Sequence, residues 1–198
     1  MRQRLENCEK AAVLAVVLVF AVTGWASVSI AQEWPSWRGP GDDGMARGDA
    51  PVAWDENQNV KWKVDIPGRG HSSPVVWGNQ IFVTTAIQIG TQPERSRGRR
   101  WSPHGDTGPQ SAHRFIVLSI DRTTGELLWE RTAAEAIPQE GFHAQYGSFA
   151  SNSPVTDGEH VFAYFGSRGL YCYDLDGRLI WQRDLGQMRS FLQFGEGT

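Results

Sequence analysis

Two stretches of this chain carry nearly the same amino-acid pattern. Residues 118–131 read LSIDRTTGELLWER, and residues 171–183 read YCYDLDGRLIWQR. Each stretch has an apolar run, a turn rich in Asp or Gly, and a second apolar run that leads to a Trp. A second phrase also recurs, because SPVVWGNQIFV at residues 73–83 resembles SPVTDGEHVFA at residues 153–163. Such tandem repetition constrains the architecture before any single residue indicates a chemistry.

Each repeat predicts four β-strands joined by short turns. Apolar and β-branched runs alternate with pairs that tolerate positive φ, such as Gly78 with Asn79. The expected strands are residues 72–77, 80–86, 115–120 and 126–132 in the first repeat, and 150–156, 160–165, 170–173 and 179–185 in the second. No stretch shows a helical period of useful length, so the sequence predicts an all-β fold.

A loop insertion separates the second and third strands of the first repeat. Residues 87–112 are rich in Arg, Gly, Ser and Pro, a composition that is typical of a loop. Without this insertion, the first repeat has about the length of a standard four-stranded propeller blade, roughly 40–45 residues. The two complete units are therefore placed at residues 71–133 and 150–185.

The segment before the first repeat predicts one more strand. Polar and apolar residues alternate over residues 59–66, which indicates a half-buried strand. Its apolar positions are Val60, Trp62, Val64 and Ile66. The segment carries the Trp of a repeat but has no three partner strands before it. We therefore expect it to close the ring from the N-terminal side, as the last strand of a blade whose other strands lie at the far end of the chain.

A four-stranded unit repeated in tandem leaves an apolar face open on each side. Radial stacking into a β-propeller is the usual solution. The sequence thus predicts about two complete antiparallel blades and an N-terminal closing strand. Because the smallest usual ring has about four blades, we expect the sequence to be the N-terminal part of a longer protein. The alternative is a stand-alone two-sheet sandwich, which leaves wide apolar faces in water.

Residues 1–31 have the pattern of an export signal. A basic start precedes an unbroken apolar run at residues 11–22, and small residues stand before the expected cleavage after Ala31. The run is short for a membrane span. The alternative is an uncleaved membrane anchor. We expect no other contact of the protein with a membrane. A leader at residues 32–58, rich in Pro and Gly, predicts irregular structure. The expected location is the periplasm or the cell envelope.

Charge and cysteine content narrow the possible partners. Without residues 1–31, the chain has 16 basic and 20 acidic residues, a net charge of about −4. This mildly acidic balance argues against nucleic-acid binding. Cys172 is then the only cysteine, so no disulfide forms within the mature chain and its stability depends on core packing. Cys172 stands in an apolar strand, where a buried, inert thiol is expected.

The first repeat contains a motif that resembles a known family. Ser119-x-Asp121-x-x-Thr124-Gly125-Glu126-x-x-Trp129 resembles the tryptophan-docking motif of the pyrroloquinoline-quinone (PQQ)-like β-propeller repeat. The copy in the second repeat is one residue shorter and has Asp-Gly in place of Thr-Gly. The phrase WPSWRGP at residues 34–40 also looks like the start of secreted bacterial propellers of this group. The resemblance covers about residues 34–198.

This resemblance implies structural roles for the recurring residues. In the family, the Trp of one blade stacks against a neighbouring blade and the Thr-Gly pair makes the turn. The residues to which the resemblance gives this role are Trp62, Asp121, Thr124, Gly125, Trp129, Asp174, Gly177 and Trp181. Because the same position recurs in every unit, we interpret the tryptophans as packing residues rather than as a ligand platform, and the two Asp residues as carboxylates that fix turns.

The same blades serve quinoprotein dehydrogenases, the BamB-like group of outer-membrane assembly lipoproteins, and other exported proteins, so the fold does not give the function. Our preferred hypothesis is an exported, non-catalytic propeller that acts as a binding or scaffold module for envelope proteins or a small ligand. This hypothesis assigns no catalytic residue, no metal and no cofactor to the protein. The alternative is a fragment of a PQQ-dependent quinoprotein dehydrogenase, which implies PQQ and calcium. The chain lacks the vicinal Cys pair that such enzymes commonly carry.

Two loops are candidates for ligand binding. His71 and His143 each stand before the first strand of a unit, where propeller loops reach a central face. His143 is followed by Gln145 and Tyr146, and this polar and aromatic mixture is typical of a binding loop. The alternative is a loop that packs over the edge of its blade. The five His residues are scattered, without the close spacings that make metal sites recognisable.

Overall fold

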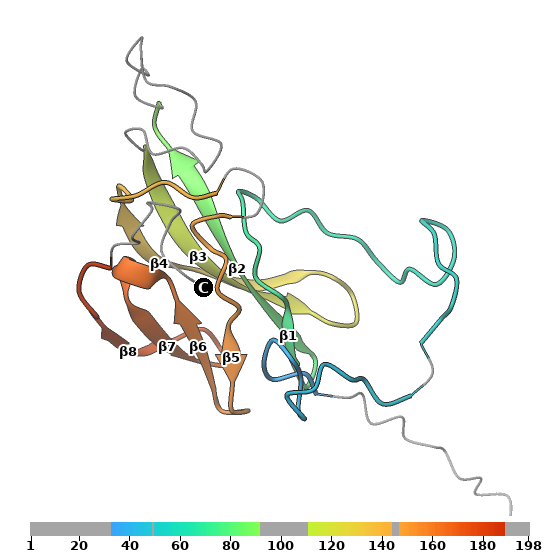
Figure 1. The fold of residues 1–198 in the computed structure, drawn as a ribbon. Helices are drawn as coiled ribbons and strands as arrows, with labels where there is room; N and C mark the ends of the chain where they lie inside the picture. The colour runs from blue at the N-terminus through green and yellow to red at the C-terminus, as the bar shows by residue number, and fades with distance from the viewer. Residues whose placement is uncertain (1–32, 49, 92–110, 144–146, 189–198) are drawn as a thin grey trace, which may run out of the picture. The chain divides into compact units, whose positions relative to one another are not determined.

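The computed structural model describes residues 33–48, 50–91, 111–143 and 147–188. Within these residues the fold is two four-stranded antiparallel sheets and one short 3-10 turn (Figure 1). The first sheet contains β1 (Val75–Trp77), β2 (Gln80–Ile89), β3 (Ala112–Asp121) and β4 (Leu127–Ala136). The second contains β5 (Val155–Thr156), β6 (His160–Tyr164), β7 (Leu170–Asp174) and β8 (Leu179–Arg183), with the 3-10 turn η1 (Gly166–Arg168) between β6 and β7.

Each sheet is a meander in which strands pair in chain order, β1-β2-β3-β4 and β5-β6-β7-β8. The tight turns use glycines at positive φ, including Gly78 at 56° and Gly158 at 93°, where a side chain would be strained. Both sheets thus have the four-stranded antiparallel form predicted for propeller blades, and this prediction is confirmed. Among the described residues, no helix has the length and apolar character needed to cross a membrane.

Several predicted boundaries differ from the observed ones. β2 continues to Ile89 and β3 already begins at Ala112, so both strands enter the segment 87–112 that the sequence assigned to an insertion. They pair through to the Ile89↔Ala112 register. The start of the second unit differs in the opposite direction, because residues 150–154 are not strand and β5 has only two residues. Ser153 Oγ accepts a hydrogen bond from the N–H of Ser73 instead.

The predicted strand at residues 59–66 is wrong for the described structure. No strand is formed there, and the apolar side chains of Val60, Val64 and Ile66 are 44%, 37% and 39% exposed. The physical reason is the lack of a partner, because no described strand runs beside this segment and a strand needs a neighbour for its backbone hydrogen bonds. Trp62 alone is half-buried, so the closing segment is attached by its Trp and not by pairing.

The main core lies between the two sheets. It includes apolar side chains from both, such as Phe82, Phe115 and Trp129 from the first and Val161 and Tyr173 from the second. The backbone of the leader also joins them, because Trp34 forms an antiparallel bridge with Val76 of β1 and the carbonyl of Pro35 accepts a hydrogen bond from Thr156 of β5. The two blades are therefore in direct contact.

Candidate functional site

Trp129 on β4 is the central side chain between the blades. It is only 8% exposed. Its indole Nε1–H donates a hydrogen bond of 2.8 Å to the carbonyl of Leu175, in the turn between β7 and β8. Its ring covers Gly177 so closely that a Cβ on that glycine would lie 2.7 Å from the ring. The carbonyl of Leu175 also accepts a hydrogen bond of 2.9 Å from Gln80 Nε2. One blade therefore holds the turn of the next through two side chains.

Aromatic and cationic groups surround this indole. The ring centroids of Phe82 and Tyr173 lie 5.9 Å and 6.3 Å from that of Trp129. The guanidinium of Arg131 stands 5.6 Å from the Trp129 centroid, and its Nε donates to the carbonyl of Gly177. Burial raises the pKa of Tyr173 to about 12, with a further contribution from neighbouring Tyr171. Tyr173 is therefore neutral at physiological pH and acts as a packing residue.

Trp62 makes the same contacts on the preceding turn. Its indole Nε1–H donates a hydrogen bond of 2.9 Å to the carbonyl of Arg122. Its ring covers Gly125, where an added Cβ would lie 2.7 Å away. Arg122 directly follows the turn aspartate Asp121, and Leu175 directly follows the turn aspartate Asp174. The turns between β3 and β4 and between β7 and β8 are thus equivalent acceptors for an indole.

Trp181 stands at the equivalent position on β8 but has a different environment. It is half-buried, and the ring centroid of Phe162 lies 6.0 Å from its own. No described residue accepts a hydrogen bond from its indole N–H. Cys172 is its register partner on β7 and is 1% exposed. Burial raises the pKa of the Cys172 thiol, which matches the expectation of an unreactive side chain.

The two turn aspartates accept backbone hydrogen bonds. Asp121 Oδ1 accepts from the N–H groups of Thr123 (2.7 Å) and Thr124 (2.8 Å), and its Oδ2 accepts from Asn79 Nδ2 (2.6 Å). The hydrogen bond from the Thr124 backbone contributes most to lowering the pKa of Asp121. Asp174 Oδ1 accepts from the N–H of Arg178 at 2.7 Å. Both carboxylates therefore shape turns, as their sequence context indicates.

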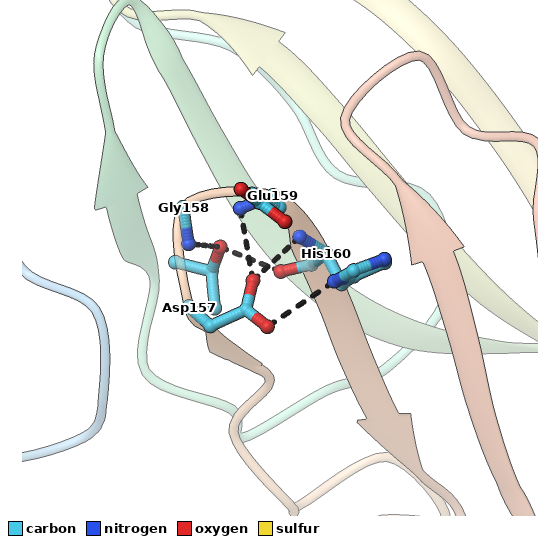
Figure 2. A network of polar contacts seen from close by, with 5 residues as sticks. Asp157, Gly158, Glu159 and His160 are labelled. Carbon is cyan, nitrogen blue, oxygen red and sulfur yellow. Dashed lines mark hydrogen bonds and ion pairs between the residues drawn. The ribbon is translucent and has the colours of Figure 1, made fainter.

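Asp157 repeats this arrangement in the turn between β5 and β6 (Figure 2). Its Oδ1 accepts from the N–H groups of Glu159 at 2.9 Å and His160 at 2.6 Å. Its Oδ2 lies 3.2 Å from Nδ1 of His160. The bond from the Glu159 backbone contributes most to lowering the pKa of Asp157. Trp77 packs on Gly158 of the same turn, so this network also supports a contact between the blades.

Acid should weaken the fold through Asp121. Because its pKa is lower in the folded than in the unfolded chain, its contribution is complete above the unfolded pKa, near 4, and is lost as the pH falls through the folded value. We expect Asp121→Asn to lose less free energy of unfolding than the wild type between pH 6 and pH 3. Urea unfolding at both pH values measures this. The control is Asp65→Asn. The carboxylate of Asp65 accepts no hydrogen bond from the backbone or side chain of a described residue, unlike that of Asp121. Equal losses in wild type and Asp121→Asn contradict the prediction.

The two predicted binding loops lie next to each other at one edge of the blades. The N–H of His71 donates a hydrogen bond of 3.0 Å to the carbonyl of Ala150, which joins the segment before β1 to the segment before β5. The carbonyl of His143 accepts from the N–H of Gly147 at 2.8 Å. His71 is exposed and His143 is half-buried. Gln145 and Tyr146 lie outside the described residues. A binding role for the four residues stays a prediction.

A row of side chains that sequence reasoning missed extends along this edge. Arg69 stands 4.8 Å from the ring centroid of Phe142, and Phe142 meets Phe149 edge to face at 4.7 Å. Phe149 in turn meets His113 at 4.7 Å. Burial lowers the pKa of His113, whereas its Nδ1 contact with the carbonyl of Ser111 acts in the opposite direction. The sequence contains only a weak indication of this row, because its four residues are spread over three segments.

The register explains why these loops share an edge. Ile89 pairs with Ala112, and His113 pairs with Ala136 at the end of β4. The β2–β3 loop and the segment leading to β5 therefore leave the first sheet on the same side, whereas the turns around Asn79 and Asp121 leave on the other. We call these the loop edge and the turn edge. Among the described residues, no group of three or more His, Cys, Asp or Glu side chains is placed to hold a metal ion.

Comparison with known families identifies the repeat. Residues 113–194 match the family model described as outer membrane protein assembly factor BamB. This part of the chain is similar to the PQQ-like repeat family. The match starts in β3, continues through the whole second sheet and so includes the Trp129 contact and the turn that accepts it. No curated protein matches the chain.

Proposed function

We propose that this PQQ-like repeat protein is an exported, non-catalytic propeller module that binds other proteins of the bacterial cell envelope or a small ligand. The observation that carries the proposal is the use of the repeated residues. Trp129 and Gly177 form the contact between blades, and Asp121 and Asp174 accept hydrogen bonds within their own turns. The parts that recur are thus occupied with building a rigid stack, which leaves recognition to the loops.

The loop edge is the surface that we assign to binding. Exposed Arg69 and Ile137 lie at this edge with half-buried Phe142 and Phe149, whereas His113, which contacts Phe149, is buried. Aromatic residues and Arg are enriched at protein interfaces. The blade contact holds the two loop segments together, because the N–H of His71 binds the carbonyl of Ala150 across them. The acidic balance of the mature chain supports a protein or small-molecule partner over nucleic acid.

Site-specific photo-crosslinking in the bacterial envelope tests the binding surface. A photoreactive residue is placed at His71 or Ile137 on the loop edge, or at exposed Glu159 on the turn edge as a matched control. We expect a discrete adduct with an envelope protein from the loop-edge positions and none from Glu159. Adducts from Glu159 alone, or equal diffuse labelling from all three positions, contradict the assignment of the surface.

A reporter fusion tests export. Residues 1–58 are joined to an alkaline phosphatase that is active only outside the cytoplasm, and the matched control lacks residues 1–31. We expect phosphatase activity from the first fusion and none from the second. Inactivity of both fusions, with the protein present in the cytoplasm, contradicts export.

The alternative activity has its own assay. The full chain is incubated with PQQ and Ca²⁺, and alcohol-dependent reduction of a dye is measured. We expect no dye reduction above that of PQQ and Ca²⁺ alone. Alcohol-dependent turnover that saturates with alcohol contradicts the non-catalytic proposal and favours a quinoprotein dehydrogenase.

A further inference from the structure

An open cavity of about 500 Å³ lies between the two sheets, beside the turn that joins β7 and β8. One wall is formed by residues 131–133 of β4, and the other by residues 176–179 of the turn and the start of β8. Tyr173 of β7 also lines it. Both walls belong to the sheets that the Trp129 contact joins, and the volume is in the range of small-molecule sites.

Tyr173 brings a hydroxyl without a hydrogen-bond partner to this cavity. The residue is 3% exposed, and its ring packs near Trp129. Its hydroxyl forms no hydrogen bond with a described residue. Among these residues, Arg114 Nε is the only side-chain polar atom that is sealed from solvent without such a bond, so the Tyr173 hydroxyl still reaches solvent. Because an unpaired polar group in a buried site is costly, a ligand that accepts a hydrogen bond from it is favoured there.

Arg131 places a fixed cation in the same cavity. Its Nε donates a hydrogen bond of 2.6 Å to the carbonyl of Gly177, which holds the guanidinium against the turn. Burial is the main cause that raises the pKa of Tyr173, and the charge of Arg131 acts in the opposite direction, so this cation lies near the hydroxyl. The terminal nitrogens of Arg131 contact the carbonyls of Glu130 and Asp176. Each terminal nitrogen carries two N–H groups, which leaves donors for a ligand.

Arg178 supplies a second cation at the opposite wall. Its side chain is 77% exposed, and its Nε lies 3.6 Å from Asp174 Oδ2. Such an exposed ion pair is weak. The terminal N–H groups of Arg178 have no acceptor among the described residues, so they are available to an anion in the cavity.

The charges of the lining favour a ligand with one negative charge. Arg131 and Arg178 contribute two positive charges and Asp176 one negative charge, which gives a net charge of about +1. The carboxylate of Asp176 disfavours a dianion. Ala133 and Leu179 add apolar surface. A single carboxylate on an apolar body complements this lining.

We propose that this cavity binds a small monocarboxylate. Its carboxylate accepts hydrogen bonds from the Tyr173 hydroxyl and from the guanidinium groups of Arg131 and Arg178, and its apolar part lies against Leu179. The cavity adjoins the β7–β8 turn, which is equivalent to the β3–β4 turn at the turn edge. It is therefore separate from the loop edge, and its test is independent of the proposed binding of envelope proteins.

An NMR titration of the full chain with phenylacetate tests the proposal, with neutral phenylacetamide as the matched control ligand. We expect saturating shifts of the backbone amides of Thr132, Gly177 and Arg178, with a dissociation constant on the order of 1 mM. Phenylacetamide should bind at least about tenfold more weakly. Inorganic phosphate should also shift these amides less than phenylacetate does.

Three variants locate the contacts. Tyr173→Phe keeps the ring and removes the hydroxyl, and it should weaken binding about tenfold. Arg178→Gln should weaken it about threefold, because the lost cation is exposed. Arg183→Gln removes an equal charge from β8 outside the cavity lining and should leave the affinity unchanged. Circular dichroism checks that each variant is folded, and exposed Arg178 provides a test that does not disturb the core.

Four outcomes overturn the proposal. The first is the absence of saturating shifts in the wild type up to about 10 mM phenylacetate. The second is equal binding of phenylacetate and phenylacetamide, because the carboxylate then has no role. The third is wild-type affinity in folded Tyr173→Phe. The fourth is a loss in Arg183→Gln as large as that in Arg178→Gln, because the effect then comes from overall charge and not from this cavity.

Discussion

Replacing Trp129 by alanine is expected to lower the free energy of unfolding by about 3–5 kcal/mol. The substitution removes a side chain that is 8% exposed, leaves a cavity between the sheets and deprives the carbonyl of Leu175 of one donor. Urea unfolding followed by circular dichroism measures the change. The matched control is Trp54→Ala, because Trp54 is 70% exposed and its loss should cost no more than about 0.5 kcal/mol. Similar values for both variants contradict a role of Trp129 in joining the blades.

Gly177→Ala should have the second largest effect. An alanine Cβ at this position would lie 2.7 Å from the ring of Trp129, and the residue has φ of +77°. Overpacking costs about 1–3 kcal/mol, and the left-handed backbone conformation adds about 1–2 kcal/mol for a side chain. The expected loss of free energy of unfolding is therefore about 2–5 kcal/mol.

Gly186→Ala separates the two causes. Gly186 has φ of +79°, but an added Cβ there meets no atom within 4 Å. Its substitution therefore reports the backbone cost alone, about 1–2 kcal/mol. The excess loss in Gly177→Ala then measures the contact with Trp129. If the two variants lose the same free energy of unfolding in urea, the close approach of the indole to the turn is not supported.

The repeat itself explains why the blades could be predicted. Tandem phrases fix strand, turn and strand in order, and the pairing of Trp77 with Gln80 follows from the short turn between them. Strand ends were less predictable, because β2 and β3 extend each other toward Ile89 and Ala112 by pairing, an effect that local composition does not contain. The strand predicted at residues 59–66 does not form, for a different reason. The alternation around Trp62 is suited to a strand, but a strand also needs a partner at its edge.

The candidate site likewise has residues that the sequence could predict and residues that it could not. The indole contacts of Trp62 and Trp129 use positions that a repeated motif marks, so sequence alone could single out both residues. The row from Arg69 through Phe142 to His113 could not be predicted, because its members come from the segment before β1, the segment after β4 and strand β3, which are far apart in the sequence. His71 and His143 were chosen for their place before a first strand. The structure brings their segments together through the bond from His71 to Ala150.

Hydrogen exchange at the indole N–H groups, followed by NMR, tests the central claim most directly. Signals are assigned by replacing each Trp with Phe in turn. If the indole of Trp129 donates to Leu175 between the blades, its N–H should exchange as slowly as the protected amides of β2 and β3, whereas that of exposed Trp54 should exchange at the rate of free indole. Exchange of the Trp129 N–H at the rate of Trp54 would contradict the account.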